Sequence, residues 1–454
     1  MQLDDDLCFR ATRSRDPRFD GRFFTAVITT GIYCRPICPA KAARRENLRF
    51  FAYAAAAQRA GFRPCLRCRP EVAPWTPAWN GTSATVTRAL RLIGEGALDD
   101  GDVDALAVRL GVTSRQVRRL FDEHVGAPPV AVAQARRVHF ARTLLVETSL
   151  PIADVAFAAG FSSLRRFNAA MRGAYRVAPR AMRRGRAAVG ASTAITLRLP
   201  YREPYDWRGL LQFLGRRAIP GVESITGDEY RRTIAVGDAA GVLRVRDDGG
   251  ALLVSLPRAF THHLKPIVDR VRRMFDLFAD PHAIASHLRR DGMLRPLVER
   301  WPGARVPGAW DPFELAVRAI VGQQVSVAGA TTIVGRIAAR YGSRIDTGDD
   351  ALSVLFPDAR RLANARIGSM PRARAAAIRD VARASGALDG VRGVGPWTLN
   401  YVSMRGGDPD AFPAGDLALR KAAGGCNERA LLQRAEAWRP WRSYAAMLLW
   451  RSLA

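Results

Sequence analysis

The stretch Val391–Tyr401, which reads VRGVGPWTLNY, decides how the C-terminal half of this chain is interpreted. Gly393 and Gly395 form a Gly-x-Gly turn, and the residues after them have the character of a helix. A hairpin of this kind that opens a helix exposes backbone N–H groups, which can hold a phosphate group. Gly-x-Gly alone is a weak signal, so the interpretation depends on what lies further along the chain.

The second part of the pattern is PAGDL, Pro413–Leu417, which follows the hairpin. A carboxylate at the start of a helix after such a hairpin is the arrangement of helix-hairpin-helix DNA glycosylases. On this basis residues 194–454 resemble the AlkA-type 3-methyladenine DNA glycosylases. The further matches are Pro204–Trp207, Ile320–Ala328 and Trp438–Ala445.

The resemblance implies a specific chemistry. Such an enzyme flips the damaged nucleotide out of the duplex to reach its N-glycosidic bond. Asp416 is the expected catalytic carboxylate, which stabilises the oxocarbenium-like sugar or orients the attacking water. An aromatic pocket can favour a cationic alkylated base by cation–π stacking. The residues that the resemblance assigns to this pocket are Trp397, Tyr401, Trp450 and Phe213.

Two further residues follow from the same resemblance. Gln324 lies where the family places the residue that fills the gap left by the flipped base. Trp397 lies at the hairpin position where bifunctional relatives carry a lysine, which would form a Schiff base and cut the strand. Its presence predicts a monofunctional enzyme that leaves an abasic site.

Structural alternatives stay open for this half. Asp416 can be a plain helix N-cap, and a tryptophan is more often a core residue than a pocket residue. The segment before the hairpin, residues 384–392, is also shorter than the full helix that family members hold there. Gly386 and Gly390 weaken helix formation further, so the phosphate clamp is expected to be weakened.

Upstream of the hairpin the pattern is that of strands. Ile195–Leu199 alternates between apolar and polar residues, and so do the segments near Thr233, Leu243 and Leu253. The alternation predicts a small antiparallel sheet, accompanied by a helix from about Trp207 to Arg217. From about residue 262 onward the chain is predicted to be mostly helical.

Cysteine spacing points to a different chemistry in the N-terminal half. Four of the six cysteines form a C-x3-C pair and a C-x2-C pair, namely Cys34, Cys38, Cys65 and Cys68. The acidic start of the chain has no apolar segment typical of a secretion signal, so paired cysteines favour zinc over disulfides. Four thiolates complete a closed tetrahedral zinc site, and we expect one zinc ion. Chance clustering is the alternative, and the lone Cys8 and Cys426 are expected to be ordinary thiols.

The first cysteine pair lies in the string TTGIYCRP, Thr29–Pro36. This string and both cysteine spacings resemble the N-terminal domain of Ada-type proteins, which repair methylphosphotriesters in DNA. The resemblance implies that Cys34 accepts the methyl group, once and irreversibly. Methylation would remove one negative charge from the zinc–thiolate cluster, so that DNA binding tightens in a salt-dependent manner. The alternative is a zinc ion that acts only as a structural staple.

Two helix-turn-helix patterns follow, at Leu106–Phe121 and Ile152–Phe167, each with a glycine at the turn. A paired repeat of this kind resembles the AraC-type DNA-binding domain. In Ada-type proteins the same order of domains makes a transcriptional activator, which implies RNA polymerase as a partner. Arginine is the commonest reader of guanine, and the candidate DNA contacts are Arg115, Arg118, Arg165 and Arg166. A generic helical bundle with solvated arginines is the alternative.

Composition agrees with a nucleic-acid partner. The chain has 454 residues, with 70 Lys and Arg against 42 Asp and Glu, a net charge of +28. Both halves carry the excess, which favours a polyanion such as double-stranded DNA and argues against a small cationic substrate. We find no apolar run of about 20 residues, the length of a membrane-spanning helix. We expect a cytoplasmic monomer that does not bind membranes.

Together these patterns predict a multidomain α+β protein of four parts. They are a small zinc-bound α/β domain (1–76), an all-α double helix-turn-helix domain (80–184), a small antiparallel-sheet α+β domain (194–285) and an all-α helix-hairpin-helix glycosylase domain (286–454). The linkers are predicted at 74–77 and 183–192. The leading hypothesis is an alkylation-damage sensor and activator fused to a repair glycosylase. The alternative is a transcriptional regulator whose glycosylase half binds DNA without catalysis.

Overall fold

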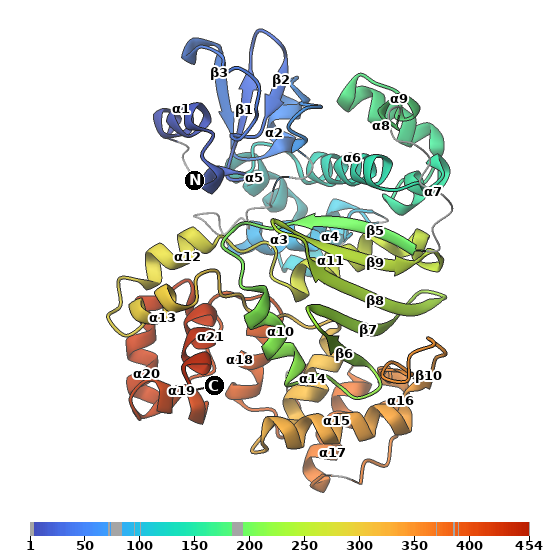
Figure 1. The fold of residues 1–454 in the computed structure, drawn as a ribbon, viewed down its shortest axis with the longest axis vertical. Helices are drawn as coiled ribbons and strands as arrows, with labels where there is room; N and C mark the ends of the chain where they lie inside the picture. Colours follow the sequence, from blue (N-terminus) through green and yellow to red (C-terminus); the bar gives the residue numbers. More distant parts are fainter. Residues whose placement is uncertain are drawn as a thin grey trace. The chain divides into compact units, whose positions relative to one another are not determined.

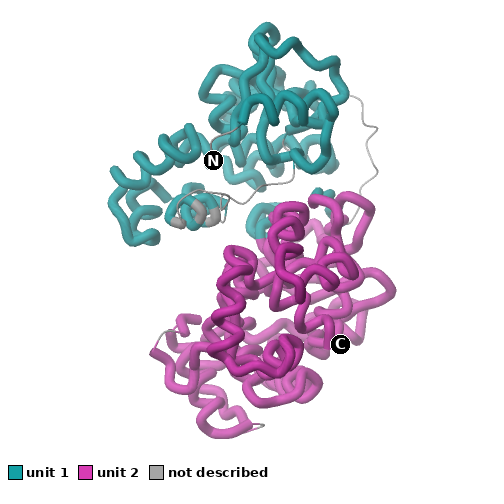
Figure 2. The backbone as a smooth tube through the Cα atoms, turned by 90° about the vertical axis from the view of Figure 1, so that its left-hand side faces the viewer, with its two compact units in different colours: residues 1–200, 260–269 teal, residues 201–259, 270–454 magenta. Residues whose placement is uncertain are grey.

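The structure of the chain is a computed structural model that describes residues 4–70, 73, 84–94, 96–99, 101–183, 194–368, 370–384, 386–388 and 390–453. The predicted linker at 74–77 lies outside the described residues, as does nearly all of the linker predicted at 183–192. The chain forms two compact units (Figure 2). The first unit comprises residues 1–200 and 260–269, and the second comprises residues 201–259 and 270–454.

The N-terminal part of the first unit is a small mixed sheet with flanking helices (Figure 1). The strand order is β3-β1-β2-β4, in which β1 is antiparallel to β2 and β3, and β2 is parallel to β4. Its elements are α1 (Asp5–Ser14), η1 (Pro17–Phe19), β1 (Phe24–Val27), β2 (Ile32–Cys34), η2 (Arg45–Asn47), β3 (Leu48–Phe51), α2 (Ala54–Arg59) and β4 (Arg63–Pro64). Buried Phe24, Tyr33 and Phe62 form its core with small alanines.

The rest of the first unit is helical, as the apolar periodicity predicts. Its elements are α3 (Ala84–Gly94), α4 (Val103–Leu110), α5 (Ser114–His124), α6 (Pro129–Glu147), α7 (Ile152–Ala158), α8 (Leu164–Tyr175) and α9 (Pro179–Arg183). Strand β5 (Ala194–Pro200) follows, with every second residue buried, and η4 (Arg258–His263) and α11 (Leu264–Met274) come later in the chain. The pairs α4–α5 and α7–α8 are the two predicted helix-turn-helix units.

The second unit begins with the predicted antiparallel sheet. Strands β6 (Glu223–Thr226), β7 (Glu229–Val236), β8 (Ala239–Asp247) and β9 (Ala251–Pro257) pair in chain order, each antiparallel to the next. Helix α10 (Trp207–Gly215) precedes them and begins where the sequence predicts, with the Asp206 carboxylate capping the Gly209 N–H.

Helices make up most of the remaining chain, again as predicted. They are α12 (Pro281–Leu288), α13 (Arg295–Arg300), α14 (Pro312–Val321), α15 (Val327–Tyr341), α16 (Ala359–Leu362), α17 (Arg372–Arg383), α18 (Pro396–Arg405), α19 (Leu417–Ala422), α20 (Glu428–Ala435), η5 (Glu436–Trp438) and α21 (Arg442–Ser452). One short pairing of β10 (Ser343–Arg344) with β11 (Val354–Leu355) interrupts them, a detail that the all-α prediction did not include.

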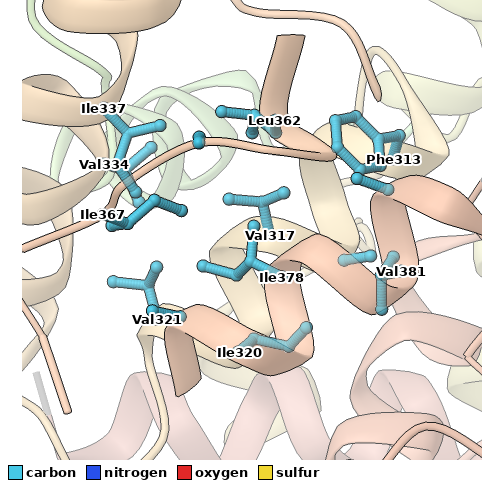
Figure 3. Packing of buried hydrophobic residues seen from close by; sticks show 14 of the residues in the cluster. Phe313, Val317, Ile320, Val321, Val334, Ile337, Leu362, Ile367, Ile378 and Val381 are labelled. Atoms are coloured by element: carbon cyan, nitrogen blue, oxygen red, sulfur yellow. The ribbon is translucent and has the colours of Figure 1, made fainter. Parts of the chain in front are cut away.

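The core of this helical part lies around α14 (Figure 3). Phe313, Val317, Ile320 and Val321 follow the spacing of one helix face, which buries them together. They contact Val334 and Ile337 of α15, Leu362 of α16, and Ile378 and Val381 of α17. This packing fixes the two helices, α14 and α18, whose ends carry the second of the two sites described below.

Candidate metal centre and active site

The sheet of the first unit brings the four predicted cysteines together. Cys34 ends β2 opposite Thr25 of β1, and Cys65 follows β4, where its N–H donates to the Tyr33 carbonyl at 2.9 Å. The four cysteine sulfurs all lie within 4.8 Å of one another. Four thiol donors at this separation fit a single zinc ion, whose usual site is tetrahedral. Cys38 lies in the turn after β2, and its N–H donates to the Arg35 carbonyl.

Exposure differs among the four cysteines. Cys65 and Cys68 are buried, whereas Cys34 and Cys38 are partly exposed. The Arg35 N–H donates to the Cys68 sulfur at 3.3 Å, and its guanidinium pairs with the buried Asp20. The Arg35 backbone thus contributes a hydrogen bond to the cluster, while its guanidinium charge is paired with Asp20.

The two remaining cysteines, Cys8 and Cys426, do not belong to this cluster. Cys8 is buried in a small apolar core with Ala11 and Phe23, and burial raises the pKa of its thiol to about 12. A thiol with a raised pKa is a poor nucleophile. Cys426 lies in the turn before α20, away from the zinc-type cluster.

The two helix-turn-helix units have the predicted turn geometry. Gly111 ends α4 with φ +72°, and the Thr113 hydroxyl accepts from the Gln116 N–H at the start of α5. Gly160 with φ +81° and the Ser163 cap repeat this arrangement before α8. Positive φ favours glycine, which explains the residue at both turns. The four candidate DNA-contacting side chains are exposed, namely Arg115 and Arg118 on α5 and Arg165 and Arg166 on α8.

The second site centres on Asp416, whose carboxylate has three N–H donors. Asp416 caps α19, where its Oδ1 accepts from the Leu419 N–H at 2.9 Å. The Trp450 indole N–H donates to the same oxygen at 3.0 Å, and the Trp397 indole N–H donates to Oδ2 at 3.0 Å. The carboxylate is thus an N-cap, and it is also held by two aromatic side chains from α18 and α21. Trp397 thus fixes the second carboxylate oxygen, which the cap does not use.

The predicted aromatic residues meet around this carboxylate. Trp397 and Tyr401 stack with ring centroids 5.3 Å apart and an interplanar angle of 10°. Trp450 lies on the other side of Tyr401, at 6.2 Å and 60°. All three are only partly buried, which is unlike a core tryptophan such as Trp438 at 0% exposure. The aromatic cluster therefore presents ring surface to a ligand next to Asp416.

Two arginines, which the sequence analysis did not single out, complete this cluster. The Arg217 guanidinium lies 3.8 Å from the Phe213 ring centroid, and the Arg405 guanidinium lies 5.0 Å from it. Arg405 is 5% exposed and donates to the Tyr401 hydroxyl at 2.8 Å. Each arginine follows its aromatic partner by four residues, Tyr401 to Arg405 within α18 and Phe213 to Arg217 across the end of α10. That spacing was the available signal.

The two guanidinium groups affect the pKa of the Tyr401 hydroxyl. Burial alone would raise the pKa of Tyr401, but the guanidinium groups of Arg405 and Arg217 outweigh it, and its pKa lies below the usual value. Burial lowers the pKa of Arg217. The Arg318 side chain of α14 donates to the Arg217 carbonyl at 2.8 Å and pairs with Glu223 and Glu314. A buried ion network therefore holds the arginine side of the cluster.

The hairpin adopts the predicted turn. Gly393 has φ +87°, and Gly395 is the N-cap of α18, without a side-chain cap of its own. The helix before it, α17, ends at Arg383, and none of the described residues between 384 and 394 is helical. Residues 385 and 389 of the shortened segment lie outside the described residues. The predicted shortening is thus present in the described part of the segment.

A glutamine that the sequence analysis passed over supports this shortened hairpin. The Gln323 side-chain amide donates to the Gly393 carbonyl and to the Thr398 hydroxyl, both at 2.9 Å. The adjacent Gln324 is exposed and has φ +54° in the turn between α14 and α15. Gln323 thus fastens the turn to the hairpin, while Gln324 projects from it.

Comparison with known families matches three regions of the chain, in the predicted order. Residues 7–71 match the metal binding domain of Ada, residues 106–185 match a helix-turn-helix domain, and residues 196–311 match the AlkA N-terminal domain. A solved structure, the 3-methyladenine DNA-glycosylase from Archaeoglobus fulgidus, is similar in fold. It is 19% identical with a TM-score of 0.51, and the match covers 56% of this chain and 97% of that one.

Some curated relatives match one half of this chain, and others match its whole length. DNA-3-methyladenine glycosylase 2 of Escherichia coli is 34% identical over 56% of this chain and 95% of its own length. The bifunctional transcriptional activator/DNA repair enzyme Ada of Escherichia coli is 40% identical over 32% of this chain and 40% of its own length. A relative from Mycobacterium tuberculosis, described as a probable bifunctional transcriptional activator/DNA repair enzyme AlkA, is 42% identical over 100% of this chain and 97% of its own length. The chain therefore belongs to the family of bifunctional transcriptional activator/DNA repair enzymes in which an Ada-type zinc domain and an AraC-type helix-turn-helix domain are fused to an AlkA-type glycosylase.

Proposed function

We propose that this chain couples two reactions on alkylated DNA. Cys34 takes a methyl group from a DNA methylphosphotriester, and the modified protein binds promoter DNA and activates transcription with RNA polymerase. The second unit hydrolyses the N-glycosidic bond of alkylated bases of the 3-methyladenine and 7-methylguanine type. The four domains have the bounds given above, and the protein acts as a cytoplasmic monomer. No helix in the described part of the chain is long and apolar enough to cross a membrane.

The observation that carries the glycosylase proposal is the threefold donation to Asp416. A carboxylate fixed at both oxygens beside stacked aromatic rings can face positive charge that develops on the sugar of a flipped nucleotide. In the proposed step the bond between C1′ and the base nitrogen breaks, and its electron pair leaves with the base, which neutralises the cationic purine. Water adds to C1′ and loses a proton, so that an abasic site remains.

The roles of the other residues follow from their places. Trp397, Tyr401, Trp450 and Phe213 line the base pocket, and Gln324 enters the gap in the duplex. The backbone N–H groups at Gly393 and Gly395 hold a DNA phosphate. Trp397 cannot form a Schiff base, which makes the reaction monofunctional.

The methyl transfer rests on the grouped sulfurs and on the partial exposure of Cys34. The Cys34 thiolate attacks the methyl carbon, an S–C bond forms, the bond between the methyl carbon and the phosphate ester oxygen breaks, and the phosphodiester leaves with the electron pair. Zinc, when held by Cys34, Cys38, Cys65 and Cys68, supplies a thiolate that is nucleophilic at neutral pH. The loss of one negative charge favours phosphate binding through exposed side chains such as Arg115, Arg118, Arg165 and Arg166.

The test of catalysis is base release from methylated DNA by the full chain and by Asp416→Asn. Asparagine also caps helices, so this variant keeps α19 while it removes the carboxylate charge. Asp358→Asn is the matched control, because Asp358 caps α16 outside the site. We expect release to fall about 100- to 1,000-fold in Asp416→Asn only. Equal release by both variants would remove the catalytic role of Asp416, and no release by the natural protein would support the alternative, a regulator whose glycosylase half only binds DNA.

The test of the methyl acceptor is intact mass after incubation with methylphosphotriester DNA. We expect one added methyl group, placed on Cys34 by peptide mass, and the same uptake by the control Cys426→Ser. No adduct on either protein would support the other alternative, in which zinc is a structural staple.

A further inference from the structure

Helix α6 connects the zinc-type cluster to the second helix-turn-helix unit. It spans 19 residues and contacts α2 of the zinc domain as well as α7 and α8. The Tyr33 hydroxyl lies 3.0 Å from Nε2 of His139 on α6, and Gln58 of α2 donates to that hydroxyl at 3.0 Å. Tyr33 immediately precedes Cys34. The residue beside the proposed methyl acceptor is thus bound to α6 by a buried polar contact.

Arg142 extends this contact toward the sulfurs. It follows His139 by three residues on α6, is 5% exposed, and donates to the Leu66 carbonyl at 3.3 Å. Leu66 lies in the turn between Cys65 and Cys68. Burial lowers the pKa of Arg142. A guanidinium from the helix-turn-helix domain therefore lies at the turn that carries Cys65 and Cys68.

The same guanidinium also contacts α8, the second helix of the second helix-turn-helix unit. It lies 5.5 Å from the ring centroid of Tyr175, the last residue of α8. Tyr175 is 0% exposed, and among the described residues its hydroxyl has no hydrogen-bond partner. The contact between α8 and Arg142 thus depends on the ring face. Helix α8 also contacts β4, which leads into Cys65.

An ion pair also joins the zinc domain to α6. Arg69, next to Cys68, donates to Glu147 at the end of α6 at 3.1 Å, and both side chains are mostly buried. Arg69, beside the cluster, and Glu147, on α6, thus form an ion pair between the zinc domain and α6. Because these groups are shielded from water and salt, a change of one charge at the cluster is felt more strongly here than on a surface.

We infer that Arg142 couples the charge of the cysteine cluster to helix α8, so that methylation of Cys34 alters how firmly the second helix-turn-helix unit is held. The inference rests on the proposed methyl transfer. Before transfer, the thiolates attract the guanidinium, which in turn holds the Tyr175 ring. After transfer one negative charge is gone, the attraction weakens, and the end of α8 is held less tightly.

The test is amide hydrogen exchange of the zinc-loaded full chain before and after methylation with methylphosphotriester DNA, which is then removed with salt. We expect amides near the end of α8 to exchange about threefold to tenfold faster after methylation, since one buried charge interaction weakens. Amides of α5 serve as the internal reference and should not change. Methyl on Cys34 with unchanged exchange in α8 would overturn the coupling and leave the methyl acceptor intact.

Substitutions of Arg142 distinguish the loss of its charge from a failure of the protein to fold. In Arg142→Met the response of α8 to methylation should disappear, and in Arg142→Lys, which keeps the charge, part of it should remain. Arg172→Met is the control, because it removes an exposed arginine from α8 itself, and it should respond like the natural protein. A full response in Arg142→Met contradicts the inference. If Arg142→Met does not fold, the comparison of Arg142→Lys with Arg172→Met and the natural protein decides. Absence of methyl on Cys34 would refute the methyl acceptor and the coupling together.

Discussion

The cysteine cluster of the first unit and the aspartate site of the second unit obtain chemical activity in opposite ways. The cluster gathers four like groups, whose negative charge as thiolates requires a metal ion to balance it. The aspartate site holds one carboxylate with neutral indole donors, and its arginines contact Tyr401 and Phe213 instead. The first centre is suited to one irreversible transfer that changes its charge. In the proposed function, the second returns to its starting state after each reaction.

The largest effect expected from this difference comes from metal removal. A chelator should unfold the zinc domain, because binding of structural zinc contributes on the order of 10 kcal/mol to folding. Methyl uptake should vanish, whereas base release should stay within about twofold, as no zinc-type cluster occurs elsewhere in the described residues. Limited proteolysis of residues 4–70 and a base-release assay on one sample would show this. A parallel loss of base release would contradict the separation of the two centres.

Acid should distinguish the two units in a second way. Burial lowers the pKa of His139 in the first unit to about 4, so the stability that its neutral form contributes is present above pH 6.5 and is lost as the pH falls toward 4. The loss should be about 3 kcal/mol. Thermal unfolding of the natural protein and of His139→Gln between pH 7 and pH 4 measures it. A slope that is equal in both proteins would mean that His139 does not titrate in this way.

Asp276 of the second unit should have the reverse dependence. Burial raises its pKa to about 6, so its contribution is present at low pH and is lost as the pH rises through 6. Asp276→Asn, which stays neutral, should therefore gain stability relative to the natural protein as the pH increases from 4 to 7. If the stability difference between Asp276→Asn and the natural protein stays constant over this range, the opposite pH response of the two units is wrong.

Removal of an indole donor should have a smaller effect on base release, and this effect should be confined to the second site. Trp450→Phe and Trp397→Phe each remove one hydrogen bond to the Asp416 carboxylate and keep an aromatic ring. A hydrogen bond to a charged group contributes about 1.5–3 kcal/mol, so kcat should fall roughly tenfold to 100-fold. If the rings serve base binding alone, KM should rise while kcat stays constant. Trp310→Phe is a control from outside the site.

The smallest effect expected is at the DNA surface of the first unit. Arg165→Ala should weaken DNA binding by the methylated protein modestly, and each lost phosphate contact should reduce the salt slope by about 0.9. Base release should be unaffected. An unchanged salt slope together with altered sequence preference would assign Arg165 to a base edge instead.

Sequence reasoning succeeded where chemistry is local in the chain. The cysteine pairs, the turns at Gly111 and Gly160, and the cap at Asp416 each lie within a few residues that determine one another. The contacts of Asp416 with Trp397 and Trp450 were not predicted, since only tertiary packing brings α18, α19 and α21 together. Arg142 was invisible for the same reason. Its neighbours, Leu66 and Tyr175, come from distant segments, and a buried arginine on a helix resembles a solvated one in sequence.

The central claim is that one chain carries two separate reactions. The most direct test incubates the natural protein, Cys34→Ser and Asp416→Asn with DNA that contains both methylphosphotriesters and alkylated bases. Added methyl groups are counted by intact mass, and free bases are counted by chromatography. We expect Cys34→Ser to release bases without gaining a methyl group, and Asp416→Asn to gain one methyl group while its base release falls about 100-fold or more. Base release by Asp416→Asn at the rate of the natural protein would contradict it.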